Sequence, residues 1–293
     1  MKLFPEGPTA TALGVAWVRA FYSRLPQPLG VVQDPIAGRL IPAPLAALAR
    51  VPSLSPRLGA AVQSALTRAF SGMPTNIALR TAAIDDAIDD AVHRGSQQMV
   101  ILGSGLDARS WRMDALHDTA VFELDRASSH RYKQKRLRQV PSKTRSHSFV
   151  PIDFEREKIR NVLRKAGHDP SLPTTWLWEG VAIYLTREAT DQTLDAIAHL
   201  SAPRSTVIAT YTCPNLGRGN GSSMFWRAAA RAVGEPIRGE TTTDDLHARL
   251  GQRNFEVLSD EGNNEAIHRY WGDAHAGDAT EWERVVVAIR RSC

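Results

Sequence analysis

Residues 99–109 have the sequence MVILGSGLDAR, and this stretch decides the fold. Its first four residues form an apolar run without polar alternation, which is typical of a strand buried on both faces of a parallel sheet. The run leads into Gly103 and Gly105, which let the chain turn sharply and let bare backbone approach a ligand. A second apolar run, Val121–Leu124, ends on Asp125, 20 residues after Gly105. At this spacing a carboxylate at the tip of the second strand accepts hydrogen bonds from ribose hydroxyls, so we predict a nucleoside cofactor.

The charge in the glycine turn indicates which nucleoside cofactor the protein binds. Asp107 follows the turn at the place where dinucleotide-binding proteins present an open helix N-terminus to a pyrophosphate. A carboxylate there repels phosphate and suits a ligand with a cationic group. S-adenosylmethionine carries a ribose, an ammonium and a sulfonium and has no phosphate. We therefore favour S-adenosylmethionine as the cofactor, with a NAD-dependent oxidoreductase as the alternative.

Seven stretches are predicted to be strands, and helical stretches separate the first five. This alternation predicts an α/β fold in which those five strands are parallel and joined by right-handed crossovers. A polar loop without a clear helix, residues 262–280, separates the last two strands and predicts a hairpin-like pair at the sheet edge. The seven predicted strands are residues 99–104, 121–125, 147–153, 174–179, 205–212, 255–260 and 284–290.

Residues 1–95 are predicted to be mainly helical. This region contains more helix than is needed to cover the sheet, so we predict that it forms a cap over the substrate site. Residues 96–293 are predicted to form the cofactor-binding domain, with an insert at about 214–250, between strands five and six, as a second part of the lid. The predicted cap helices are Thr11–Arg24, one opened by Asp34 and Pro35, Arg57–Phe70 and Pro74–His93.

The composition excludes several classes of protein. The net charge is +5, and the two cysteines, Cys213 and Cys293, form no disulfide framework, which indicates reduced thiols in a cytoplasmic protein. No apolar run reaches 18 residues, so we predict no membrane span. We predict no metal site, because the chain has no CxxC or HExxH pattern.

A basic run, residues 126–145, contains eight Lys and Arg residues and no acid. We interpret it as the solvated face of the helix after the second strand. A nucleic-acid surface is the alternative, but Tyr132 is the only aromatic residue available for base stacking, so we do not expect a nucleic-acid partner.

Residues that follow successive strands are expected to converge, because the carboxyl ends of parallel strands lie at one edge of the sheet. Asp153 is then placed to accept a hydrogen bond from the adenine amino group. Phe154 is placed to donate its backbone amide to a ring nitrogen. The converging residues are Gly103, Gly105, Asp107, Asp125, Asp153, Phe154, Glu179 and Gly180.

Five motifs in a fixed order carry a family resemblance. They are RTAAID (80–85), LGSGLDAR (102–109), FELD (122–125), PIDF (151–154) and WEGVAIYL (178–185). Together they resemble the leucine carboxyl methyltransferase family, and more closely its bacterial branch of S-adenosylmethionine-dependent O-methyltransferases. The resemblance extends from about Thr11 to the final strand. It implies the Rossmann-like, seven-stranded fold of class I methyltransferases, with S-adenosyl-L-homocysteine as the product of the cofactor.

The resemblance also implies roles for single residues. Arg80 would pair with the methionine carboxylate of the cofactor, and Glu179 would face its ammonium group. The remaining cofactor-binding residues would be Gly103, Gly105, Asp107, Leu124, Asp125, Asp153 and Phe154.

The expected reaction is methyl transfer to a carboxylate or phenol oxygen of a small molecule, which we expect to be an anionic or phenolic secondary metabolite. Tyr184 and Glu179 are the predicted catalytic residues. Arg19, Tyr22 and Arg24 of the cap are predicted to grip the acceptor. The alternatives are a protein C-terminal carboxylate as acceptor and an RNA-directed methyltransferase. The sequence indicates no oligomeric state.

Overall fold

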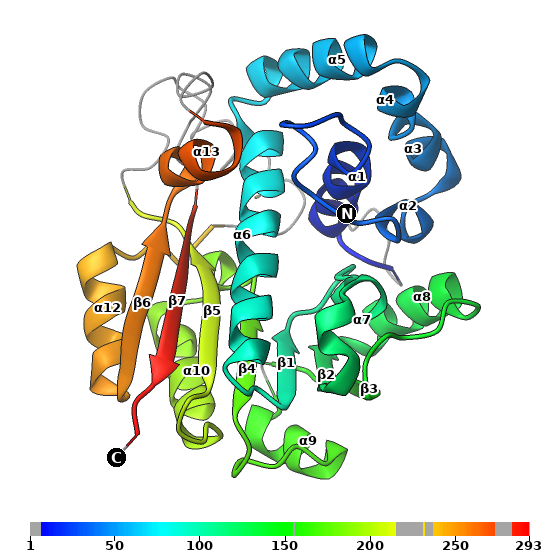
Figure 1. Ribbon diagram of the computed structural model, residues 1–293. Coiled ribbons are helices and arrows are strands. Elements are labelled where there is room, and N and C mark those ends of the chain that lie inside the picture. Colours follow the sequence, from blue (N-terminus) through cyan, green and yellow to red (C-terminus); the bar gives the residue numbers. More distant parts are fainter. Residues whose placement is uncertain (1–6, 155, 215–230, 232–236, 273–282, 293) are drawn as a thin grey trace.

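The computed structural model describes residues 7–154, 156–214, 231, 237–272 and 283–292. A seven-stranded sheet forms its centre, with the strand order β3-β2-β1-β4-β5-β7-β6 (Figure 1). Strands β1 to β5 are parallel, and β7 runs antiparallel to both of its neighbours. The strands are β1 (Gln98–Leu102), β2 (Ala120–Asp125), β3 (Ser146–Pro151), β4 (Thr174–Trp178), β5 (Thr206–Tyr211), β6 (Phe255–Glu261) and β7 (Arg284–Arg290). The predicted fold is thereby confirmed, and every predicted strand bound is correct to within two residues.

Both faces of the central strands are buried. In β1, Val100 and Leu102 belong to the core on one face, whereas Met99 and Ile101 belong to the core on the other. This alternation is the two-residue period of a strand, and it explains why the sequence shows an unbroken apolar run. The first face is covered by α9 (Ile159–Ala166), α10 (Arg187–His199) and α12 (Thr243–Gln252).

The other face of the sheet is covered by α6 (Met73–His93), which runs along the strands in Figure 1. Its first half contributes Ile77 and Leu79 to the cap core. Its second half contributes Ile84 and Ile88 to the sheet core. This helix therefore joins the two parts that the sequence predicts to divide at residue 95.

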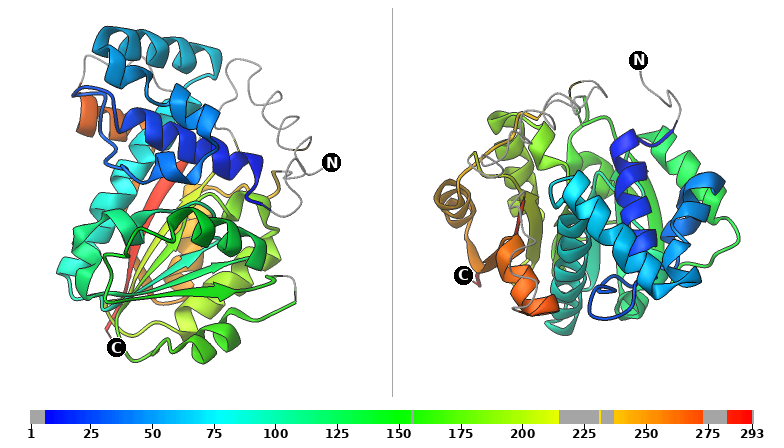
Figure 2. Two further views of the ribbon diagram at one scale, coloured as in Figure 1. Left: turned by 90° about the vertical axis from the view of Figure 1, so that its right-hand side faces the viewer. Right: turned by 90° about the horizontal axis from the view of Figure 1, so that it is seen from above.

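The predicted helical cap is present at one end of the sheet, as Figure 2 shows. The helix predicted to open at Asp34 begins at Ala37, with Ile36 as its N-cap, and the side chain of Asp34 accepts hydrogen bonds from the backbone N–H groups of Ile36 (3.1 Å) and Ala37 (2.8 Å). Two short helices, α3 and α4, were not predicted, because six and four residues are too few to show a helical period. The cap helices before α6 are α1 (Ala10–Tyr22), α2 (Ala37–Leu40), α3 (Ala43–Leu48), α4 (Val51–Leu54) and α5 (Pro56–Ala69).

The prediction of a helix-free loop at residues 262–280 is wrong, because α13 (Asn263–Trp271) forms there. The backbone N–H of Gly262 donates to Glu265 Oε2 (3.0 Å) and so caps the first turn. Ile267 and Trp271 are buried in the core that the cap shares. The amphipathic pattern was present, but the polar residues between its apolar positions concealed it.

Most of the predicted insert at about 214–250 lies outside the described residues. The short elements of the sheet domain are α7 (Arg109–Arg112), η1 (Asp114–Asp118), α8 (Ala127–Leu137) and η2 (Ala182–Tyr184). Among the described residues, no helix combines the length and apolar character needed to cross a membrane.

Candidate functional site

The glycine turn after β1 is tied to the tip of β2. The N–H of Gly105 donates to Asp125 Oδ2 (2.7 Å), and the N–H groups of Gly103 and Ser104 donate to the Leu124 carbonyl (2.8 and 3.1 Å). Asp125 is half-buried, and its other oxygen accepts from the N–H of Arg126 (2.6 Å). The structure thus brings the first two predicted strand tips together and leaves the Asp125 carboxylate at the surface of the turn.

Gly103 occupies a position that excludes other residues. Its φ is +67°, and a Cβ atom there would lie 2.5 Å from Val181 Cγ2. Val181 follows β4, so the turn after β1 packs directly against the turn after β4. The carboxyl end of β4 is thereby brought beside the turn that follows β1.

Arg109 is fully buried and binds three carboxylates. Its Nε lies 2.7 Å from Asp85 Oδ1, its Nη1 lies 2.8 Å from Glu179 Oε2, and it forms a further ion pair with Asp107. The N–H of Arg109 also donates to Asp107 Oδ1 (2.7 Å). The predicted carboxylate beside the first turn is therefore present, but its charge is already matched within the protein.

The ion pairs determine the charge state of these acids. Burial raises the pKa of Asp107, but Arg109, followed by Lys133 and Arg19, outweighs it, so that this pKa lies far below its usual value. Burial also raises the pKa of Glu179, but Arg109 and Arg80 outweigh it, so that this pKa lies below its usual value. Both groups are carboxylates at neutral pH and weak proton acceptors.

Arg80 reaches the same place from α6. Its Nε lies 3.2 Å from Glu179 Oε1, and its Nη1 is ion-paired with Glu283. Its Nη2 lies beside Gly180, 3.7 Å from where a Cβ atom would be. Burial lowers the pKa of Arg80, but Glu283 and Glu179 outweigh it and raise this pKa, with a smaller contribution from Tyr184, the predicted catalytic tyrosine. Glu283 was not predicted, because it precedes the last strand and belongs to none of the motifs.

The ion-pair network continues into the cap. Arg112 makes two contacts of 2.7 Å with the carboxylate of Asp85, and its Nε lies 3.5 Å from Asp34 Oδ2. Arg19 Nε lies 3.2 Å from the same oxygen of Asp34, and Arg19 also donates to the Leu106 carbonyl. The cap is thus held to the sheet by buried charges as well as by apolar packing.

The three cap residues predicted to grip an acceptor make contacts within the protein, and their part in acceptor binding stays a prediction. Arg19 is buried and paired with Asp34. Tyr22 is buried, and its hydroxyl lies 3.2 Å from Thr75 Oγ1. Arg24 is half-buried and donates to the Ala20 carbonyl of its own helix. These contacts hold the three side chains within the cap and its junction with the sheet.

The predicted adenine-binding residues lie beside the tip of β2. The N–H of Ile152 donates to the Asp125 carbonyl (3.0 Å), which places the next residue, Asp153, at that tip. Asp153 and Phe154 are both exposed. Asp153 Oδ2 lies 3.5 Å from Arg156 Nε in an exposed ion pair. The two residues are therefore accessible to a ligand, and their contact with adenine stays a prediction.

The basic run is more buried than predicted. Lys133 on α8 is fully buried, its Nζ lies 2.5 Å from Glu123 Oε2, and it sits 5.1 Å from the centre of the Trp111 ring. Arg136 donates to the Ile41 carbonyl of the cap (3.3 Å). The expectation of a solvated face is wrong for Lys133, because the strand beneath carries a buried glutamate that requires a cation.

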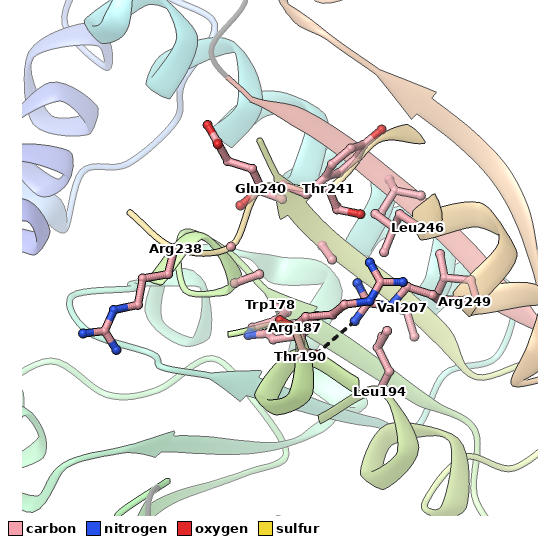
Figure 3. Close-up of a pocket in the computed structure, with 17 residues that line it drawn as sticks. Trp178, Arg187, Thr190, Leu194, Val207, Arg238, Glu240, Thr241, Leu246 and Arg249 are labelled. Carbon is pink, nitrogen blue, oxygen red and sulfur yellow. Dashed lines mark hydrogen bonds between the residues drawn. The ribbon is translucent and has the colours of Figure 1, made fainter. Parts of the chain in front are cut away.

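A pocket of about 100 Å³ lies on the side of the sheet opposite α6, and Figure 3 shows the residues that line it. It lies between α10 and α12, and Trp178, Leu194 and Arg249 are among the residues that line it. None of the predicted cofactor-binding residues contributes to it. Its lining does include the last residues of β4 and β5, Trp178 and Tyr211.

The strand tips fit the chemistry of S-adenosylmethionine. Ser104 Oγ is buried without a hydrogen-bond partner among the described residues, so this polar atom lies unmatched within the turn. Arg80 Nη2 lies beside Gly180 and is a donor suited to a carboxylate. Asp125 supplies an acceptor suited to a diol. No cluster of metal-ligating side chains occurs among the described residues.

Comparison with known proteins agrees with this chemistry. The family model described as leucine carboxyl methyltransferase matches residues 12–198. The chain belongs to this family. A candidate S-adenosyl-L-methionine-dependent methyltransferase of Frankia alni is 39% identical over 206 residues, which cover 70% of this chain and 68% of the relative. One from Mycobacterium marinum is 38% identical over 252 residues, which cover 85% of this chain and 79% of the relative.

Solved structures share the fold of this leucine carboxyl methyltransferase family member. A candidate methyltransferase of Thermobifida fusca superposes with a TM-score of 0.60 at 14% identity, over 98% of this chain and 97% of the other. A DUF574 family protein of Streptomyces avermitilis gives a TM-score of 0.54 at 14% identity, over 80% and 90%. With the family established, the protein is an S-adenosylmethionine-dependent methyltransferase.

Proposed function

We propose that this enzyme transfers the methyl group of S-adenosylmethionine to a carboxylate oxygen of a small acidic molecule. One observation carries the choice of a carboxylate. The acids beside the strand tips, Asp107 and Glu179, are ion-paired, and their pKa values are lowered. Glu179 holds Arg80 with one oxygen and Arg109 with the other, so it is poorly suited to the general-base role that its predicted place among the catalytic residues would imply.

In this proposal the acceptor is a nucleophile that needs no proton transfer to Asp107 or Glu179. A carboxylic acid with a pKa of about 4 is ionised at neutral pH, whereas a phenol with a pKa of about 10 is not. A phenol would need a positioned proton acceptor. The arrangement around Glu179 therefore favours a carboxylate acceptor.

In this proposal the protein contributes binding, orientation and exclusion of water. Arg80 binds the carboxylate of the cofactor, Asp125 binds its ribose, and Asp153 with Phe154 binds its adenine. When bound, the cofactor supplies an electrophilic methyl group on a sulfonium sulfur. The cap covers the turn after β1, since a Cβ atom on Gly105 would lie 3.7 Å from Ala12 Cβ, and so it shields this edge of the sheet.

The chemistry of the product tests the proposal. The purified enzyme is incubated with methyl-labelled S-adenosylmethionine and a panel of carboxylic acids, each matched by a phenol of similar size. A methyl ester releases labelled methanol in mild alkali, whereas an aryl methyl ether does not. We expect label only in alkali-labile products and a rate that changes little between about pH 6 and pH 9, because a carboxylate is ionised throughout. Label confined to alkali-stable products would overturn the carboxylate assignment and favour a phenol.

A protein C-terminal carboxylate is a second candidate acceptor, because the family's description names a leucine carboxyl group. Peptides that end in a free leucine carboxylate, compared with the same peptides amidated at that end, distinguish it from a small acid. Methylation of the free peptides at rates above those of every small acid would favour the protein acceptor.

A further inference from the structure

The guanidinium group of Arg80 lies between two glutamates from different strands. Glu179 follows β4 and contacts Nε at 3.2 Å, and Glu283 precedes β7 and contacts Nη1. The side chains of Arg80 and Glu283 are each 10% exposed. Two of the three guanidinium nitrogens, Nε and Nη1, are therefore held by glutamates, and the third, Nη2, lies beside Gly180.

Glu283 is itself held in place. Thr210 Oγ1 donates to Glu283 Oε1 (3.4 Å) and accepts a hydrogen bond from the N–H of Gly180 (2.9 Å). The next residue, Arg284, begins β7 and pairs with Tyr211 of β5. The position of Glu283 is thus set by the sheet, and the same threonine connects it to the turn after β4.

We propose that Glu283 is a positioning residue. Together with Glu179 it fixes the plane of the Arg80 guanidinium, so that Nη2 is presented to the carboxylate of the methionine part of the cofactor. This inference rests on the proposed contact between Arg80 and the cofactor.

The physical reason is preorganisation. A free arginine side chain has several rotatable bonds, and ordering it on binding reduces affinity. The two carboxylates that hold Nε and Nη1 order the guanidinium group of Arg80 before the ligand binds. The negative charge of Glu283 acts in the opposite direction by repelling the incoming carboxylate. The methionine part brings its ammonium along with its carboxylate and adds no net charge, so positioning outweighs this repulsion.

Two ligands that differ only in the methionine part isolate this effect. S-adenosylhomocysteine contains the amino-acid portion, whereas 5′-deoxy-5′-methylthioadenosine keeps the adenosine and the thioether and lacks that portion. The dissociation constants of both are measured by calorimetry for the wild type, Glu283→Ala, Glu283→Gln and Glu261→Ala. Glu261 is a matched control, because it pairs with Val285 at the same sheet edge and contacts Arg269 instead of Arg80.

We expect Glu283→Ala to weaken S-adenosylhomocysteine binding by about tenfold and to leave methylthioadenosine binding within about twofold, as for the loss of one charge-assisted contact. Glu283→Gln should lie between wild type and alanine, since its amide oxygen still accepts from Arg80. Glu261→Ala should match the wild type. Thermal melting shows that each variant is folded.

Three outcomes would overturn the proposal. Unchanged binding of S-adenosylhomocysteine would mean that Glu283 does not act on the site. An equal loss for both ligands would indicate general damage. Tighter binding of S-adenosylhomocysteine would make Glu283 a competitor of the cofactor carboxylate.

A further variant, Arg80→Met, separates this inference from the site assignment beneath it. If Arg80→Met weakens S-adenosylhomocysteine and spares methylthioadenosine, the Arg80 contact stands, and the Glu283 variants decide the positioning role. If Arg80→Met has no effect on either ligand, the Arg80 assignment fails, and the role of Glu283 fails with it.

Discussion

Arg109 Nη1 lies 2.8 Å from Glu179 Oε2, and this contact joins the turn after β1 to the tip of β4. The same guanidinium binds Asp85 of α6 and Asp107 of the turn. One buried cation therefore connects three elements that are distant in sequence. Without it, the neighbouring carboxylates would be buried with too little positive charge.

Arg109→Met is expected to lower the free energy of unfolding by about 3–5 kcal/mol, because it leaves buried carboxylates uncompensated. Urea denaturation at pH 7 measures the loss. Arg187→Met is the control, since the ion pair of Arg187 with Asp245 is largely exposed and should contribute far less to stability. Similar small losses in both variants would contradict a special role for the buried network.

The pair between Lys133 and Glu123 predicts non-additive behaviour. In Lys133→Met the carboxylate of Glu123 loses its lysine partner and keeps its contact with His147 Nε2, at 3.0 Å. The free energy of unfolding should fall by about 3 kcal/mol. The double variant with Glu123→Gln should recover part of this loss, because the uncompensated charge is gone. A double-mutant cycle, in which urea denaturation gives the free energy of unfolding of each variant, checks this prediction. Strictly additive losses would show that the two groups act independently.

Gly103→Ala should destabilise the protein by about 1–3 kcal/mol and weaken cofactor binding, because φ is +67° and the new Cβ would meet Val181 at 2.5 Å. Adding Val181→Ala should relieve the contact and leave the backbone strain. Gly14→Ala in α1 is the control, since nothing lies within 4 Å of its added Cβ. That change should be neutral or stabilising by up to about 1 kcal/mol.

Asp125→Ala should weaken S-adenosylhomocysteine binding by about 100-fold, as expected for two charge-assisted hydrogen bonds to the ribose. Calorimetry with adenosine and with 2′,3′-dideoxyadenosine tests the cause. The variant should lose affinity for adenosine and keep its affinity for the dideoxy ligand. Equal losses for both would assign Asp125 to the structure of the Gly105 turn.

Stability is expected to fall in mild acid because of a buried histidine. Burial lowers the pKa of His168 to about 4, and its ring packs against Phe122 and Trp176. Between about pH 6.5 and pH 4 the unfolded chain binds a proton that the folded protein does not, so stability is lost as the pH falls through this range. The contribution is at most about 3 kcal/mol.

Urea midpoints between pH 7 and pH 4.5 check this expectation with His168→Leu and with His199→Gln as an exposed control. His168→Leu should show a shallower dependence on pH, and His199→Gln should keep the wild-type slope. Some slope should persist in both, because burial also lowers the pKa of His130. An unchanged slope in His168→Leu would show that this histidine is not buried in its neutral form.

The sequence by itself determined the seven strands, the cofactor class and the residues at the strand tips. These features are local, since a buried parallel strand is an unbroken apolar run and a close turn requires glycine at Gly103. The tips converge for any parallel sheet, so Asp125 and Glu179 could be placed near one another without coordinates. The N-terminal cap was likewise visible in its helical periods.

Only the tertiary structure decided which charges meet. The contacts of Arg80 with Glu283, of Lys133 with Glu123 and of Arg19 with Asp34 leave no periodic signal, because each depends on how separate elements pack. An arginine that binds a substrate and an arginine that binds a buried aspartate look the same in a sequence. The difference lies in the low-dielectric interior that the folded chain creates, where every charge requires a partner.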